Sequence, residues 1–271
     1  MPKSDIRVIV RLLKDRSKIK IKYVTMNNII SRDYMKFADM KKRICVFLKK
    51  CLFYAREVGF HRSYSQYGED ILLQGFLEDK WSWSYKGFWV DIGAHHPSNL
   101  SNTKAFSLNG WRGINVDASS DAIAKFNRHR KRDVNVNVGI GLESGILDYY
   151  RMSSSPMNTF SKDFANRAVE DGCKIIEVVR VPVITMKELL DRYLPEGQSI
   201  DFVSIDCEGL DLSILQSNDW DRYRPEYILI EIHMGGENWE IPDCPVSHYL
   251  KKQGYEFVGQ SYVTTLYKRV R

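Results

Sequence analysis

The fold of this sequence is decided by the stretch Gly87-Phe88-Trp89-Val90-Asp91-Ile92-Gly93-Ala94-His95-His96-Pro97. It begins with a short apolar run of strand-forming residues that carries one acid, Asp91, near its end. Gly93 follows at once, and Pro97 suits the first turn of a helix. A strand, a tight glycine turn and a helix form the unit that holds nucleotide-like ligands in open α/β sheets. The same pattern also occurs as a plain turn, so by itself it leaves both interpretations open.

Charge is distributed unevenly along the 271 residues. Residues 1–60 contain 16 Lys and Arg against 5 Asp and Glu, whereas residues 61–271 contain 24 against 29. We therefore predict a basic helical N-terminal extension over 1–60 and a catalytic domain over 61–271. Five scattered cysteines include no C-x-x-C pair, which argues against a zinc knuckle or a disulfide framework and favours the cytoplasm.

The N-terminal segment has the pattern of a basic amphipathic helix. Ile44, Leu48, Leu52 and Ala55 fall on one helical face, among many lysines. We favour a helix packed on the main domain or inside a homo-oligomer; peripheral contact with the inner face of a membrane, or with a partner protein, is the other interpretation. No recognised motif accompanies the charge, so we expect no nucleic-acid partner. We also expect no signal peptide and no bilayer-spanning helix, because no apolar run approaches roughly 20 residues.

Strand and helix patterns alternate from about residue 87 to residue 233. Strands are predicted near 111–117, 134–140, 200–205 and 227–233, and a hairpin-like pair near 255–267 ends the chain. This alternation predicts a doubly wound, mostly parallel α/β sheet with an antiparallel C-terminal strand. In such sheets ligands bind beyond the carboxyl ends of the strands.

Acidic residues stand at several of these strand ends. Asp117 lies 24 positions after Gly93, close to the spacing at which an acid on the second strand meets ribose hydroxyls. Capping of the next helix is the competing role for Asp117. If the topology is right, one edge of the sheet gathers Asp91, Asp117, Asp206, Glu208, Glu231 and His233.

Several segments, in this order and number, resemble the FkbM-type S-adenosylmethionine-dependent methyltransferases. They are Tyr64-Ser65-Gln66-Tyr67-Gly68-Glu69-Asp70, the stretch from Val90 to Pro97 with Ser101-Asn102-Thr103 behind it, Asn158-Thr159-Phe160, Ile205-Asp206-Cys207-Glu208-Gly209 and Glu231-Ile232-His233. The resemblance covers about residues 63–235. It implies a Rossmann-like class I methyltransferase fold and O-methylation, often of a sugar hydroxyl in surface-polysaccharide or natural-product pathways.

The resemblance also implies S-adenosyl-L-methionine as the cofactor and gives residues to each of its parts. The methionine part would be held by Asp91, Gly93, Ser101, Asn102 and Thr103, the ribose by Asp117 with Ala118, and the adenine by Val138, while Gln66, Glu69 and Asp70 would close over it. The stretch His95-His96-Pro97 departs from the glycine-rich turn of many methyltransferases, so a GxGxxG-type contact is not expected.

Methyl transfer to a sugar needs activation of a weakly nucleophilic hydroxyl. A base within hydrogen-bond reach or a divalent cation can supply it. His233 is the leading base candidate because an imidazole titrates near neutral pH, and Asp206 and Glu208 are predicted to share the catalytic work. Oxygen atoms of Asp206, Glu208 and Glu231 could instead bind Mg²⁺ or Mn²⁺. The alternatives are structural roles. His233 could hydrogen-bond only to the backbone, and Glu208 could interact with the dipole of a helix N-terminus.

The predicted function is therefore methylation of a sugar or nucleotide sugar, in the cytoplasm or at the inner face of the membrane. Two other functions stay open on the same sequence. A nicotinamide-dependent oxidoreductase would share the fold but would want a Gly-x-Gly-x-x-Gly turn where His95-His96-Pro97 stands. A non-catalytic scaffold of an envelope-assembly complex would work through the basic N-terminus.

Overall fold

The computed structural model describes residues 13–15, 18–20, 62–82, 84–232 and 243–270. The chain divides into two units, Met1–His61 and Arg62–Arg271, which we treat separately. In the first unit, β1 (Leu13–Asp15) pairs with β2 (Lys18–Lys20) in antiparallel fashion. These strands depart locally from the predicted helical extension, since Lys-Ile-Lys alternates with the period of a strand. The helix expected near 44–55 lies outside the described residues.

The second unit is built on a seven-stranded sheet with the order β11-β12-β10-β9-β3-β4-β5. From β10 to β5 every neighbouring pair is parallel, whereas β12 runs antiparallel to both β10 and β11. This order, with one reversed strand near the C-terminus, confirms the predicted class I methyltransferase fold. The strands are β3 (Phe88–Ile92), β4 (Arg112–Asp117), β5 (Val134–Asn137), β9 (Phe202–Ile205), β10 (Tyr227–Glu231), β11 (Tyr255–Ser261) and β12 (Thr264–Arg269).

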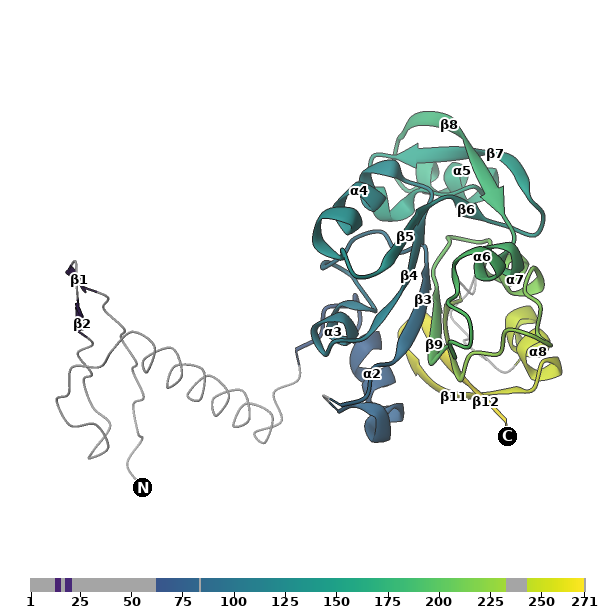
Figure 1. Cartoon of the computed structure of the whole chain (residues 1–271). Coiled ribbons are helices and arrows are strands. Elements are labelled where there is room, and N and C mark those ends of the chain that lie inside the picture. Colours follow the sequence, from purple (N-terminus) through teal and green to yellow (C-terminus); the bar gives the residue numbers. More distant parts are fainter. Residues whose placement is uncertain (1–12, 16–17, 21–61, 83, 233–242, 271) are drawn as a thin grey trace, which may run out of the picture. The chain divides into compact units, whose positions relative to one another are not determined.

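Helices cover both faces of this sheet (Figure 1). One face carries α2 (Glu69–Phe76) and α3 (Lys104–Leu108), and the other carries α6 (Met186–Tyr193), α7 (Asp211–Gln216) and α8 (Pro245–Lys252). The remaining helical elements are η1 (Glu78–Lys80), α4 (Ser120–His129), η2 (Ser155–Met157) and α5 (Lys162–Glu170). Among the described residues, no helix combines the length and the apolar character needed to cross a membrane.

The period of two along β3 divides its residues between two cores. Val90 and Ile92 join the larger apolar cluster with α6, α7 and α8, whereas Trp89 joins the cluster beneath α2 and α3. All five residues of β3 are buried, as expected for a central parallel strand. The carboxyl end of β3 is therefore fixed from both faces of the sheet.

A second sheet of three strands stands beyond the end of β5 (Figure 1). Its order is β6 (Gly139–Ile140), β8 (Ile175–Ile184) and β7 (Gly145–Met152). The single strand expected over 134–140 is thus split between two sheets. Proline favours edge strands, yet Pro182 lies in β8, which is the middle strand of this sheet. Pro182 is tolerated there because β6 pairs only with Val183 and Ile184. The N–H that proline lacks would lie beyond the end of β6 and is not needed for pairing.

The sequence from 98 to 109 has a helical pattern, but α3 begins only at Lys104. Leu100 has φ 51°, which a continuous helix does not allow. Two side chains of this turn bond elsewhere: Thr103 Oγ1 donates to Asp91 Oδ2 at 3.0 Å, and Asn102 Nδ2 donates to Ser204 Oγ at 3.1 Å. These bonds tie the turn to the ends of β3 and β9 in place of a helical first turn.

Candidate active site

The turn after β3 is packed closely against the end of β9. Gly93 has φ +81°, and a Cβ added there would lie 1.9 Å from the Asp206 carbonyl oxygen. The N–H groups of Gly93 and Ala94 both donate to the Val116 carbonyl, each at 3.0 Å. Glycine is required here for its backbone conformation and for the close approach of the β9 end. The turn therefore locks three strand ends together.

Asp117 at the end of β4 fastens the same turn from its other side. Its Oδ2 accepts the His95 N–H at 2.8 Å, and its Oδ1 accepts the Ser119 N–H at 2.7 Å. Burial raises the pKa of Asp117, and the two N–H groups oppose that rise. Each carboxylate oxygen still has a lone pair for a further donor. Asp117 thus holds the turn and also keeps capacity for a ligand.

A cavity of about 240 Å³ opens at these strand ends. Gly93, Asp117 and Asp206 line it from the large sheet. The small sheet and the segment after β7 supply the opposite wall, which includes Tyr149, Arg151, Met152, Ser155, Asn158, Thr159, Phe160 and Ile176. The cavity therefore spans the gap between the two sheets, at the carboxyl edge where the topology predicts a ligand.

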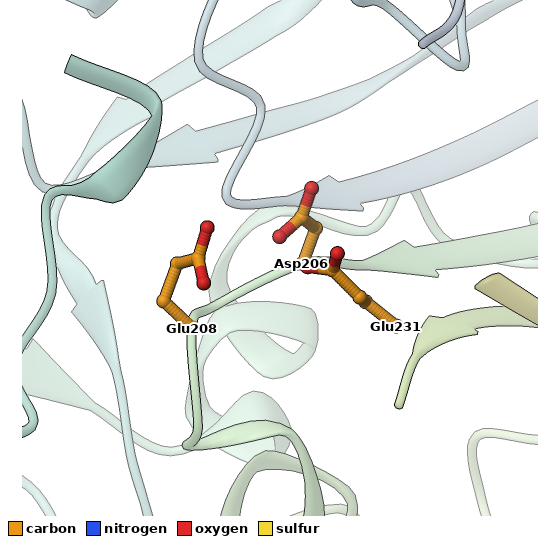
Figure 2. A group of neighbouring side chains, drawn as sticks. All are labelled: Asp206, Glu208 and Glu231. Atoms are coloured by element: carbon orange, nitrogen blue, oxygen red, sulfur yellow. The ribbon is translucent and has the colours of Figure 1, made fainter. Parts of the chain in front are cut away.

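Three carboxylates lie close together beside this cavity, and Figure 2 shows their side chains. Asp206, Glu208 and Glu231 each offer an oxygen within 4.8 Å of the others. Asp206 and Glu208 also line the cavity, and Asp206 keeps contact with solvent. The pKa of Asp206 lies well above its usual range, because many protein atoms surround it and because Glu231 bonds to it and repels its charge. One proton shared between the two acids relieves that repulsion.

The loop that carries these acids is held in an unusual conformation. Glu208 has φ 48°, which is uncommon for a residue other than glycine. Asp211 fixes the loop by accepting the N–H groups of Cys207 at 3.1 Å and Gly209 at 3.2 Å. Thr159 Oγ1 donates to the Glu208 carbonyl at 3.1 Å, which ties the loop to the opposite wall of the cavity. Strain of this kind persists only where surrounding contacts determine it.

Comparison with known proteins identifies the family. The model of the methyltransferase FkbM domain matches residues 91–257, which is more than half of the chain. The chain belongs to the FkbM methyltransferase family. The match covers the cavity residues from Gly93 to Glu208 together with Glu231.

Other comparisons are more distant. The N-terminal domain of human METTL16, solved in complex with SAH, aligns with a TM-score of 0.39 and 12% identity over 74% of this chain and 68% of that chain. A structure described as the delta-N METTL16 MTase domain aligns with a TM-score of 0.38 and 14% identity over 73% and 79% of the two chains. No curated protein matches the sequence. The fold is assigned from the strand order and not from these alignments.

The FkbM chain brings four of the predicted cofactor residues to the cavity wall: Gly93, Asp117, Ala118 and Val138. Of the predicted catalytic residues, Asp206 and Glu208 line it as well. Glu231 lies in the adjacent carboxylate cluster. His233 lies outside the described residues, so its role as base stays a prediction.

Asp91 lies behind the cavity wall and not on it. It is buried, accepts a hydrogen bond from Thr103 and is near the charge of Arg130. Burial nevertheless dominates and raises the pKa of Asp91 to about 6. Ser101, Asn102 and Thr103 likewise do not line the cavity. In this structure the side chains of these four residues hydrogen-bond with one another or with Ser204 on β9, and direct contact with a cofactor stays a prediction.

Glu69 and Asp70 organise the segment before α2. Asp70 accepts hydrogen bonds from Ser63 Oγ at 2.6 Å, from Tyr64 N–H at 2.8 Å and from Ser65 Oγ at 2.8 Å. Glu69 Oε2 accepts the Tyr67 N–H at 2.7 Å. Gln66 is exposed, and none of Gln66, Glu69 and Asp70 lines the cavity. Their predicted closure over a cofactor is not tested by this geometry.

Several cavity residues were not predicted as site residues. Tyr149 comes from β7, whose alternating pattern gives no hint of a ligand wall; burial raises the pKa of Tyr149. His95 also lines the cavity, and its Nε2 lies 3.1 Å from Ser155 Oγ. Asn158 and Thr159 carried a signal in the sequence, since their segment resembled the family, but no role followed from it. Strand patterns are visible over 146–152 and 175–184, but they do not show that these strands form a separate sheet across the cavity.

Proposed function

We propose that this chain transfers a methyl group from S-adenosylmethionine to a hydroxyl of a sugar, carried on a nucleotide or on a surface-polysaccharide precursor. Family membership supports methyl transfer. The observation that carries the rest is that one cavity joins the Gly93–Asp117 turn to Asp206 and Glu208. A donor held by the turn and an acceptor held by the acids would be neighbours.

The cavity residues fit the proposed cofactor. Asp117 can accept hydrogen bonds from two ribose hydroxyls with its remaining lone pairs, and buried Val138 offers an apolar contact for adenine. His95 Nδ1 is buried and has no hydrogen-bond partner among the described residues, so it is a free polar atom in the wall. When bound, S-adenosylmethionine supplies a methyl group on a positively charged sulfur. The surrounding carboxylates favour that charge.

Asp206 is the residue that we assign to the acceptor, since it belongs both to the cavity wall and to the carboxylate cluster. In an in-line displacement the oxygen–carbon bond forms as the carbon–sulfur bond breaks, so catalysis depends largely on position. The hydroxyl would donate to Asp206, and its proton would pass to the cluster as the new ether forms. His233 is the alternative acceptor of that proton.

A divalent cation remains the other route to an activated hydroxyl. Asp206, Glu208 and Glu231 offer only oxygen, the ligand type that Mg²⁺ and Mn²⁺ prefer. A cation held there would lower the pKa of the acceptor hydroxyl. Turnover that EDTA abolishes and added Mg²⁺ or Mn²⁺ restores would support this route. Turnover that is unchanged in EDTA removes the cation and leaves proton transfer to the side chains.

Isothermal titration with S-adenosylmethionine tests the cofactor, and release of S-adenosylhomocysteine from a panel of nucleotide sugars tests the reaction. We expect micromolar binding, weakened at least tenfold by Asp117→Ala, because the ribose hydroxyls lose their acceptor. Asp121→Ala is the matched control, since Asp121 is an acid at the same cavity without a buried carboxylate. Absence of binding at millimolar cofactor would sink the proposal.

Location and partners of the reaction are a separate proposal. A cytoplasmic enzyme, at times at the inner face of a membrane, would meet nucleotide-linked sugars where they are made. The positive surplus of residues 1–60 supports contact with anionic lipid or with a second copy of the chain. Sedimentation with anionic vesicles and mass measurement in solution, with and without residues 1–60, separate these two partners.

A further inference from the structure

Two tyrosine rings lie in contact at the surface of the second unit. Tyr67 precedes α2, and Tyr262 stands in the turn between β11 and β12. Their ring centroids are 4.4 Å apart with an interplanar angle of 48°. Tyr262 is 66% exposed and Tyr67 is 46% exposed. Such exposure of two adjacent aromatic side chains leaves ring faces free for a ligand.

The register of the sheet places this pair at the same edge as the carboxylate cluster. Glu231, the last residue of β10, is paired with Thr264, the first residue of β12, and Ile232 N–H donates to the Val263 carbonyl at 2.9 Å. Tyr262 is thus two residues from the partner of Glu231. At about 3.3 Å per strand residue, the backbone of Tyr262 comes within roughly 10 Å of Glu231.

A chain of hydrogen bonds fixes the two tyrosines with respect to the cluster. Thr264 Oγ1 donates to Glu69 Oε1 at 3.4 Å, and Glu69 Oε2 accepts the Tyr67 N–H at 2.7 Å. Ser261 Oγ donates to the Tyr67 carbonyl. Glu69 is buried, so this link is shielded from water. The segment before α2 and the β11–β12 turn are therefore held as one rigid rim.

The backbone of Tyr262 is strained. Its φ is 52°, a region that suits glycine or asparagine and is an outlier for a bulky aromatic residue. The turn would form more easily with glycine, so the ring is present at a cost in stability. Residues kept in such conformations cluster at ligand sites. Strain and exposure together indicate that the ring of Tyr262 has a role in binding a ligand.

We propose that Tyr67 and Tyr262 form an aromatic platform that binds one face of the acceptor sugar ring and directs its hydroxyl toward Asp206 and Glu231. This inference rests on the proposed function. Tyrosine offers an apolar face for the C–H groups of a sugar and a phenol for its hydroxyls. The neighbouring acids accept hydroxyl donors and repel phosphate, so the platform holds the neutral ring, and the charged carrier lies away from it.

Two substitutions test the platform without loss of the fold. Tyr262→Gly removes the ring and relieves the backbone strain, so thermal stability should be kept or increased. Tyr67→Ala removes the partner ring. We expect each to lower kcat/KM for the sugar acceptor by roughly threefold to tenfold, mainly through KM, with the Kd for S-adenosylmethionine unchanged. Tyr262→Phe should retain most of kcat/KM, since the ring face remains.

Tyr193→Ala is the matched control, because Tyr193 is also a partly exposed tyrosine but lies at the end of α6. Unchanged acceptor KM in both Tyr262→Gly and Tyr67→Ala, with normal turnover, overturns the platform and leaves the proposed function standing. Equal loss in Tyr193→Ala overturns it as well. No binding of S-adenosylmethionine by the unaltered chain defeats the proposed function instead, so the two failures are distinguishable.

Discussion

Two strand ends that share one cavity are built in opposite ways. The Gly93–Asp117 turn is satisfied: the Val116 carbonyl and both Asp117 oxygens already accept backbone N–H groups. The end of β9 and β10 gathers three acids, of which Asp206 has a strongly raised pKa. A turn whose acceptors are already hydrogen-bonded is rigid and suits a site that holds a ligand in place. Closely spaced acids, in contrast, bind protons or cations readily. We therefore infer that, within a single cavity, the turn binds the cofactor and the acids take part in the reaction.

We expect the largest effect from a substitution in the turn that binds the cofactor. In Gly93→Ala, the new Cβ meets the Asp206 carbonyl and the backbone must keep φ +81°, so the β3 turn cannot close on β9. We expect a loss of stability on the order of 3 kcal/mol or more, with loss of cofactor binding. Denaturant unfolding and calorimetric titration measure both. Gly145→Ala is the control, since nothing lies within 4 Å of its added Cβ; equal damage there contradicts the interpretation.

We expect the next largest effect from a substitution in the carboxylate cluster, which should change the reaction and not cofactor binding. Asp206→Asn keeps the size of the side chain and removes its charge, so the acceptor proton loses its nearest carboxylate. We expect kcat to fall about a hundredfold or more, with the Kd for S-adenosylmethionine within a few-fold of the original. Single-turnover kinetics and titration measure the two quantities. If cofactor affinity collapses while kcat survives, then the two strand ends do not divide the work as we argue.

A pH measurement sharpens the contrast behind the turn. The pKa of buried Asp91 is raised to about 6, so between about pH 4 and pH 6 the folded chain keeps a proton that the unfolded chain has lost. This residue therefore lowers stability as pH rises through that window, by at most about 3 kcal/mol. Over the same pH range, the free energy of unfolding of Asp91→Asn should rise relative to that of the unaltered chain. Denaturant unfolding at several pH values checks this, and a difference that runs the other way counts against it.

The smallest effect tests the tie between the two walls. Thr159→Val keeps the branched shape but removes the hydroxyl, which donates to the Glu208 carbonyl at 3.1 Å and accepts the Ser161 N–H at 2.9 Å. We expect a loss of about 1 kcal/mol in stability and a modest fall in kcat, because the strained Glu208 loop loses one restraint. Thr185→Val serves as the comparison, since it removes a helix cap of similar strength away from the acids. A fall in kcat of the same size in both variants would mean that the loop restraint has no catalytic role.

The main sheet could be predicted from the sequence, because buried parallel strands appear as continuous apolar runs that end in acids. Phe88–Ile92, Phe202–Ile205 and Tyr227–Glu231 all follow this rule. The meeting of Asp206, Glu208 and Glu231 then followed from topology. What failed was local: the 98–103 turn looks helical, because nothing in its letters reveals that Thr103 and Asn102 bond to Asp91 and Ser204.

The opposite wall of the cavity could not be predicted for a different reason. Tyr149 lies on β7 and Ile176 on β8, two antiparallel strands that are connected through η2 and α5, and their distance from Gly93 depends on how this whole segment folds back. Short-range patterns carry no information on such a return. The same holds for Tyr67 and Tyr262, which are separated by nearly the whole domain and meet through the β11–β12 turn.

The transfer of the chain from β5 to β6 has a wider consequence. Only Val138 separates the last strand on that side of the large sheet from the first strand of the small one, and Val183 and Ile184 bring the chain back. The small sheet is therefore an insert with both attachment points side by side. A segment of another length inserted at this junction would leave the strand order of the large sheet unchanged, so we expect it to be the position at which the cavity can be widened or narrowed for new acceptors.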